Sequence, residues 1–108
     1  MVYELRIYQC MPNKLPAVLA RFQSLTLKVW ERHGIEPVGF WTTMIGESHM
    51  RLFYMLRWES LAEREAKWPA AAADPEYVAG RNASEADGPL VQSVSNQILS
   101  PTVFSKLR

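Results

Sequence analysis

Residues 51–58 read RLFYMLRW, and this stretch decides the fold. Successive side chains of a β-strand point to opposite faces of its sheet, so the even-numbered Leu, Tyr and Leu share one face while Phe53 and Met55 share the other. A sheet face that is exposed to water should carry polar side chains. This strand is apolar on both faces, and both faces of its sheet are therefore expected to be covered.

Three further strands are expected on either side of this stretch. They are predicted at Val2–Cys10, Pro37–Ile45 and Leu90–Ser100, where β-branched and aromatic residues are frequent. Only residues 46–50, among them the turn residues Gly46–His49, separate the strand at 37–45 from the one at 51–58. Such a short connection predicts that these two strands pair as a hairpin.

Two helical regions lie between the strands. Apolar residues recur with a helical period over 15–33, and Gly34 is typical of a helix C-cap. Ser60–Glu63 has the form of a capping box, whereas Asp74–Pro75 predicts a second N-cap and a short helix to about Ala86. The order β-α-β-β-α-β predicts a ferredoxin-like α+β sandwich, with a four-stranded antiparallel sheet and both helical regions on one face.

The helices of such a fold leave one sheet face uncovered. Because that face would keep large apolar side chains, a second copy of the chain presenting the same face is the simplest cover. The sequence therefore predicts a homodimer. In the alternative interpretation, the tail that begins at Pro101 folds back over the sheet of its own subunit.

Length and charge restrict the classes of function. A chain of 108 residues fits one domain, expected over 1–108. Twelve basic and eleven acidic residues are spread along it, giving a net charge of +1, which disfavours contact with nucleic acid or an anionic membrane. The lone Cys10 cannot form an internal disulfide. No apolar run suits a signal peptide or a membrane span, so a cytoplasmic protein is expected.

Five short stretches resemble the NIPSNAP family, in order and over almost the whole chain. They are YELRIY at 3–8, HGIEPVGFWTT at 33–43, SLAER at 60–64, ADPE at 73–76 and NQILSPT at 96–102. The resemblance implies a dimeric α/β-barrel, in which two ferredoxin-like sheets close face to face around a central cavity. It also implies a bacterial, single-domain member of unknown role. Relatives in the wider superfamily include cofactor-free monooxygenases, haem enzymes and stress-induced proteins.

Glu4, Arg6 and Tyr8 are the candidate site residues of the first strand, where they share one face. If Leu5 and Ile7 face the helices, the three polar residues face the barrel interior. In a functional interpretation, Arg6 anchors an anion or carbonyl, Glu4 is a base and Tyr8 donates a proton. The structural interpretation, which we favour, makes Glu4 and Arg6 a paired strut that fixes the dimer register.

Four further residues are expected to line the same cavity. In the predicted hairpin, residue 43 lies opposite 53 and residue 41 opposite 55, so these side chains form one patch. An aromatic patch with a few polar groups is typical of a small-molecule site, although the packed core of a dimer interface is favoured here. The four residues are Trp41, Thr43, Phe53 and Met55, with Arg57 and Asn96 as weaker candidates.

No metal or cofactor is expected. His33 suits the last turn of a helix and His49 a solvated turn, and neither has a second ligand at metal-binding spacing. The second helical region lacks the histidine that a haem-binding relative would carry there. The main hypothesis is a protein that binds a small, partly apolar molecule in the barrel cavity or acts through protein contacts. The alternatives are a cofactor-independent monooxygenase or isomerase for a phenolic or enolisable substrate, and a purely structural or signalling module.

Overall fold

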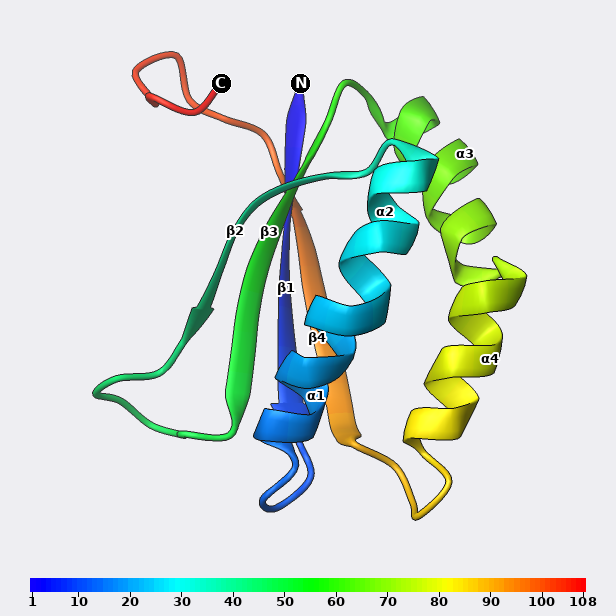
Figure 1. Cartoon of the computed structure of the whole chain (residues 1–108). Helices are drawn as coiled ribbons and strands as arrows, with labels where there is room; N and C mark the ends of the chain where they lie inside the picture. The colour runs from blue at the N-terminus through cyan, green and yellow to red at the C-terminus, as the bar shows by residue number, and fades with distance from the viewer.

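The computed structural model describes residues 1–108 as a four-stranded sheet with a layer of helices against one face (Figure 1). All strand pairs are antiparallel, in the order β2-β3-β1-β4. This arrangement confirms the predicted ferredoxin-like α+β fold. The elements are β1 (Val2–Cys10), α1 (Leu15–Arg21), η1 (Phe22–Thr26), α2 (Leu27–His33), β2 (Glu36–Thr42), β3 (Arg51–Trp58), α3 (Leu61–Ala72), α4 (Pro75–Ser84) and β4 (Val91–Leu99).

The first helical region covers the predicted residues 15–33, but its middle part is not an α-helix. η1 is π-helical, and the backbone N–H of Leu27 donates to the carbonyl of Phe22. A π-helical turn holds more residues than an α-helical turn, and three of the five residues of η1 are buried. The region ends at Gly34, whose φ of +71° confirms the predicted C-cap.

The second helical region begins and breaks where the sequence predicts. Ser60 Oγ accepts a hydrogen bond from the N–H of Glu63 at 3.1 Å, and the Glu63 carboxylate accepts one from the N–H of Glu59 at 3.2 Å. The first bond is the N-cap half of the predicted capping box, whereas the return bond from Glu63 goes to Glu59, one residue before the N-cap. Asp74 caps α4, which has Pro75 in its first turn. None of the helices has the length and apolar character needed to span a bilayer.

The pairing of β1 with β3 decides which side chains lie beneath the helices. Glu4, Arg6 and Tyr8 stand opposite the even-numbered residues of β3, which are buried in the core under the helices. Leu5 and Ile7 therefore lie on the uncovered face. The arrangement with Leu5 and Ile7 toward the helices is thus wrong. Alternation defines two faces of a strand, but it does not say which face receives the helices.

The hairpin of β2 and β3 has a different register from the predicted one. Trp41 lies opposite Phe53 and Gly39 opposite Met55, so the prediction was wrong by two residues. The physical reason is the connection: β2 ends before Thr43, and a loop longer than the expected turn precedes β3. A shift of two preserves the alternation, so Trp41, Phe53 and Met55 still share one face.

That face is only partly covered by the chain itself. The C-terminal tail curls over one end of it, on the side of the sheet away from the helices (Figure 1). Tyr3 and Met55 line a groove with tail residues 100–107, and Tyr3 is only 5% exposed. Trp41 remains 52% exposed. The tail therefore covers one end of the open face and leaves the rest uncovered.

Candidate functional site

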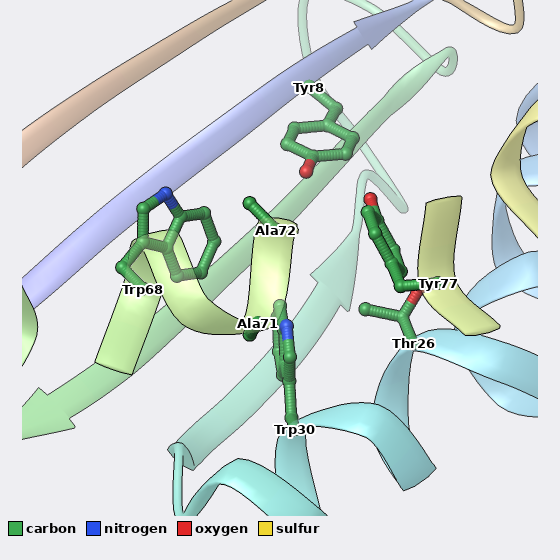
Figure 2. Close-up of a pocket in the computed structure, with 7 residues that line it drawn as sticks. All are labelled: Tyr8, Thr26, Trp30, Trp68, Ala71, Ala72 and Tyr77. Atoms are coloured by element: carbon green, nitrogen blue, oxygen red, sulfur yellow. The ribbon is translucent and has the colours of Figure 1, made fainter. Parts of the chain in front are cut away.

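A small cavity lies between the sheet and the helices, beside the corner at which α3 is followed by α4 (Figure 2). Its volume of about 40 Å³ gives room for about three water molecules. Six of its seven lining residues are hydrophobic, and the hydroxyl groups of Tyr8 and Tyr77 point into it. The lining residues are Tyr8, Thr26, Trp30, Trp68, Ala71, Ala72 and Tyr77.

A chain of hydrogen bonds connects this cavity to a buried guanidinium group. Arg6 Nε donates to Tyr54 Oη at 2.7 Å, and Tyr54 Oη donates to Tyr8 Oη at 3.1 Å. Arginine has no acceptor, so the Tyr54 oxygen accepts from Arg6 and its one proton goes to Tyr8. The proton of Tyr8 is then left free, and the hydroxyl that carries it faces the cavity (Figure 2).

At the other end of the chain lies Glu4, whose side chain is 0% exposed. A buried carboxylate is tolerated only when its oxygens are paired and hydrogen-bonded. Side chains from β1, β3, α3 and β4 meet this requirement. The donors are Arg6 Nη1 at 3.0 Å, Arg64 Nε at 2.8 Å and Nη2 at 3.2 Å, Trp58 Nε1 at 3.1 Å, and Asn96 Nδ2 at 2.9 Å.

Aromatic rings hold the two guanidinium groups in place. The guanidinium carbon of Arg6 lies 4.5 Å from the ring centroid of Trp68, and that of Arg64 lies 5.9 Å from the same ring. Cations are attracted to the face of an indole ring, most strongly where water is excluded. Arg64 also pairs with Glu65 at 2.9 Å, so Arg6 is the cation of the cluster that lies next to the tyrosine chain.

The pKa values follow from this packing. Burial acts to raise the pKa of Glu4, but the hydrogen bonds from Arg64, Asn96 and the other donors outweigh it and lower this pKa to about 2. Burial raises the pKa of Tyr54 well above its ordinary value, so this hydroxyl keeps its proton. Burial acts to lower the pKa of Arg6, yet its tyrosine and Glu4 neighbours raise it. At neutral pH Glu4 is therefore a carboxylate, Arg6 a guanidinium cation and Tyr54 a neutral phenol.

The predicted site residues form two groups on opposite faces of the sheet. Glu4, Arg6 and Tyr8 come together beneath the helices, directly or through Tyr54. Trp41, Phe53 and Met55 lie on the open face, and Thr43 is in the loop after β2. The expectation that all seven line one cavity is therefore wrong for a single chain. Of the weaker candidates, Asn96 joins the Glu4 cluster and Arg57 pairs with Glu36 at 3.8 Å.

Sequence reasoning missed several residues of this site, among them Trp58, which donates to Glu4. Tyr54 was placed only as an apolar residue of its strand, and Arg64, Trp68 and Tyr77 were not considered. One signal was available, because Arg64 and Trp68 are four residues apart and so share one face of α3. Tyr77 has no such signal, since its place at the cavity depends on how α4 turns after Asp74.

Both histidines lie outside the cavity. His33, in the last turn of α2, has Nε2 2.8 Å from Asp74 Oδ2, and Arg32 Nη2 lies 2.8 Å from the same oxygen. These contacts fasten α2 to the start of α4. No three His, Cys, Asp or Glu side chains are close enough together to hold a metal ion.

The sheet order and the single helical layer define a ferredoxin-like α+β domain, with its buried polar cluster between sheet and helices. The family model described as NIPSNAP matches residues 3–106, and the chain belongs to the NIPSNAP family. No curated protein matches the sequence.

Solved structures of bacterial NIPSNAP proteins have the same fold. A NIPSNAP family protein from Agrobacterium tumefaciens is 26% identical, with 99% of this chain and 98% of that chain covered and a TM-score of 0.87. An uncharacterised NIPSNAP domain protein from Burkholderia xenovorans is 22% identical, with 97% and 98% covered and a TM-score of 0.83. More distantly, a variant of MhuD with bound manganese protoporphyrin IX is 17% identical, with 97% and 98% covered and a TM-score of 0.66.

Proposed function

We propose that this protein binds a small, planar, partly apolar molecule in the cavity between sheet and helices. The molecule presents a carbonyl or phenolate oxygen to the hydroxyl of Tyr8. One observation carries the proposal: Arg6 and Tyr54 occupy the other positions of the hydrogen-bond chain, so Tyr8 has a proton to donate into an apolar space. The proposed site thus lies beneath the helices rather than inside a barrel formed by two sheets.

The charge of Arg6 makes Tyr8 a stronger donor. Each hydrogen bond in such a chain polarises the next, and a cation at the start increases the partial positive charge on the last proton. A donor of this kind stabilises negative charge on an acceptor, most effectively where little water competes. The apolar lining of the cavity, with Trp30 and Trp68 on its walls, meets that second condition.

Binding is favoured over catalysis because the cavity has no base. Its lining residues include no carboxylate and no imidazole. Glu4, the base expected in the functional interpretation, accepts hydrogen bonds from four side chains, and its pKa is lowered to about 2. A carboxylate held in this way is a poor proton acceptor. It acts as the strut that positions Arg6.

The cavity must widen to receive a ring. A volume of about 40 Å³ holds a few water molecules, whereas a phenol needs more space. Tyr77 is half-buried, so a turn of its ring toward solvent would widen the cavity while Trp68 stays against the guanidinium groups. Side-chain changes of this kind are common when a site binds its ligand.

A titration of 4-nitrophenol tests the proposal, because the ionised and neutral forms of this probe absorb differently. We expect the pKa of the bound probe to be lower than its pKa in buffer, since Tyr8 stabilises the phenolate. In Tyr8→Phe this difference should disappear. Tyr3→Phe is the matched control, because Tyr3 lies on the other face of β1. If the bound probe ionises as it does in buffer, or if Tyr8→Phe changes nothing, the proposal is wrong.

We further propose that the protein works as a homodimer through its open sheet face. Leu5, Ile7, Phe53 and Met55 are only half-buried there, and Trp41 is 52% exposed. A contiguous apolar surface of this kind is typical of an interface. Sedimentation velocity at micromolar concentration provides the test. A dimer is expected, and a stable monomer would contradict the proposal.

A further inference from the structure

We propose that the groove between α4 and β4 binds an anionic group of the same ligand, which would make the ligand an amphipathic acid. The inference rests on the proposed function, because the apolar part of the ligand must occupy the cavity beneath the helices. The groove contributes what the cavity lacks, namely guanidinium groups within reach of a bound molecule.

The groove and the cavity are adjoining spaces. The groove has a volume of about 490 Å³ and is lined by residues 91–94 of β4 together with side chains of α1 and α4. Tyr8 and Tyr77 line both the groove and the cavity, so these two rings separate them. A molecule that displaces the ring of Tyr77 would extend from one space into the other while Tyr8 keeps its position.

The charges in the groove favour an anion. Arg21 Nη1 lies 3.5 Å from Glu85 Oε2, and Arg81 Nε lies 3.9 Å from Glu85 Oε1. These are the charged residues that line the groove, so one carboxylate faces two guanidinium groups and one positive charge remains unbalanced. Both distances are also long for charge-assisted hydrogen bonds, which are usually about 2.7–2.9 Å.

Arg21 is held in place yet keeps unused donors. Its side chain is only 7% exposed, and its side-chain hydrogen bonds, to Ser84 Oγ at 3.2 Å and to Glu85 Oε2, both come from Nη1. A guanidinium carries five N–H groups. No fully buried side-chain nitrogen lacks a partner, so the remaining nitrogens of Arg21 are accessible to solvent. A bound carboxylate or sulfonate would receive these donors.

Arg21 and Arg81 also lie within electrostatic reach of the tyrosine that separates the two spaces. Burial raises the pKa of Tyr77, while the positive charges of Arg21 and Arg81 act in the opposite direction. An acid bound at these arginines would thus have its apolar part next to Tyr77. That geometry fits a ligand with an anionic group at one end and a ring at the other.

Two fluorescent probes of almost the same shape test this inference. 8-Anilinonaphthalene-1-sulfonate carries an anionic group, whereas N-phenyl-1-naphthylamine lacks it and is neutral. We expect Arg81→Gln to weaken binding of the sulfonate about tenfold and to leave the neutral probe unchanged, because hydrogen bonds to a charged group are stronger than those between neutral groups. Arg108→Gln, at the exposed C-terminus, makes the same change in net charge and should have no effect.

A second variant should change the affinity for the sulfonate in the opposite direction. Glu85→Gln removes the carboxylate that competes for Arg21 and Arg81, so it should tighten binding of the sulfonate and again leave the neutral probe unchanged. If neither Arg81→Gln nor Glu85→Gln changes the ratio of the two affinities, the anion subsite is wrong.

The cavity itself is tested with Ala72→Leu. Ala72 lines the cavity but not the groove, and its longer replacement should weaken binding of both probes. If Ala72→Leu has no effect on either probe, the proposed function fails as well. If Ala72→Leu weakens binding of both probes while Arg81→Gln and Glu85→Gln leave the ratio of the two affinities unchanged, only the anion subsite is wrong.

Discussion

On one side of β1, Glu4, Arg6 and Tyr8 lie beneath the helices, and on the other side Leu5 and Ile7 lie on a face that no helix covers. A sheet with a single helical layer usually turns its apolar side chains toward the helices and its polar ones toward water. β1 does the reverse, because its polar side chains face the helices and its apolar ones face away from them. Each side therefore needs a partner that a water-facing sheet would not need.

The two sides meet that need differently. Beneath the helices no fully buried side-chain nitrogen or oxygen is left without a hydrogen-bond partner within the chain. On the open face the C-terminal tail covers one end, and Trp41 still has half of its surface exposed. The polar groups of the inner side are paired within one chain, whereas the outer side is the face through which we propose that a second chain binds. Substitutions on the inner side should therefore lower the stability of the fold, whereas substitutions on the outer side should weaken association between chains.

Removal of the central carboxylate should have the largest effect. Glu4→Ala leaves Arg6 and Arg64 facing each other without their shared anion, and loss of one member of a buried ion pair costs about 3–5 kcal/mol. Urea denaturation measures the loss of unfolding free energy. Glu36→Gln is the control, because Glu36 pairs with Arg57 at the surface and its loss should change stability by less than about 0.5 kcal/mol. Equal losses in the two variants would mean that the buried cluster does not hold the fold together.

A charge on the open face should break the proposed dimer and leave the fold intact. Phe53→Arg removes an apolar side chain from each of the two facing sheets, which weakens association by about 3 kcal/mol in total and raises the dimer dissociation constant by about 100-fold. Sedimentation equilibrium measures this constant, and circular dichroism checks the fold. Leu61→Arg is the control, because Leu61 is exposed at the start of α3, away from the open face. A variant that stays dimeric would show that another surface forms the interface.

Local signals in the sequence predicted the elements well. The bounds of β3 and the caps at Ser60 and Asp74 depend on residues close to one another in the chain, and the structure has them as predicted. The face of β1 could not be predicted in this way. Alternation separates Glu4 from Leu5, but only the packing of distant helices determines which of them is buried.

The candidate site was predicted in part for the same reason. Glu4, Arg6 and Tyr8 are neighbours on one strand, so their pattern was visible in the sequence. Their partners Tyr54 and Arg64 lie about 50 and 60 residues away in sequence, and no spacing rule connects them. The hairpin register also depended on a loop length that the turn residues did not reveal.

Acid should weaken the inner side of β1 selectively. The pKa of Glu4 is lowered to about 2 in the folded protein and lies near 4.3 in an unfolded chain, so its contribution is complete above about pH 4.5 and is lost as the pH falls toward 2. Hydrogen bonds from Arg32 lower the pKa of Asp74, and hydrogen bonds from Lys28 and Arg32 lower that of Glu76. Protonation of these two carboxylates in acid therefore destabilises the fold as well. Comparison with Glu4→Gln separates the effects. Between pH 5 and pH 2.5 the wild type should lose about 2 kcal/mol more than this variant. Parallel pH profiles would contradict the lowered pKa.

The smallest effect concerns the tyrosine that links the cluster to the cavity. Tyr54→Phe removes the oxygen that accepts the hydrogen bond from Arg6 Nε. A buried donor without a partner lowers the free energy of unfolding by about 1–2 kcal/mol. Tyr8→Phe should cost less, because the bond between Arg6 and Tyr54 survives it. Urea denaturation of both variants checks this order. For ligand binding, Tyr54→Phe leaves the hydroxyl of Tyr8 in the cavity but disconnects it from the cation. The pKa of bound 4-nitrophenol should then lie between its wild-type value and its value in Tyr8→Phe. A value equal to the wild type would mean that Tyr8 acts alone and that Arg6 serves only the fold.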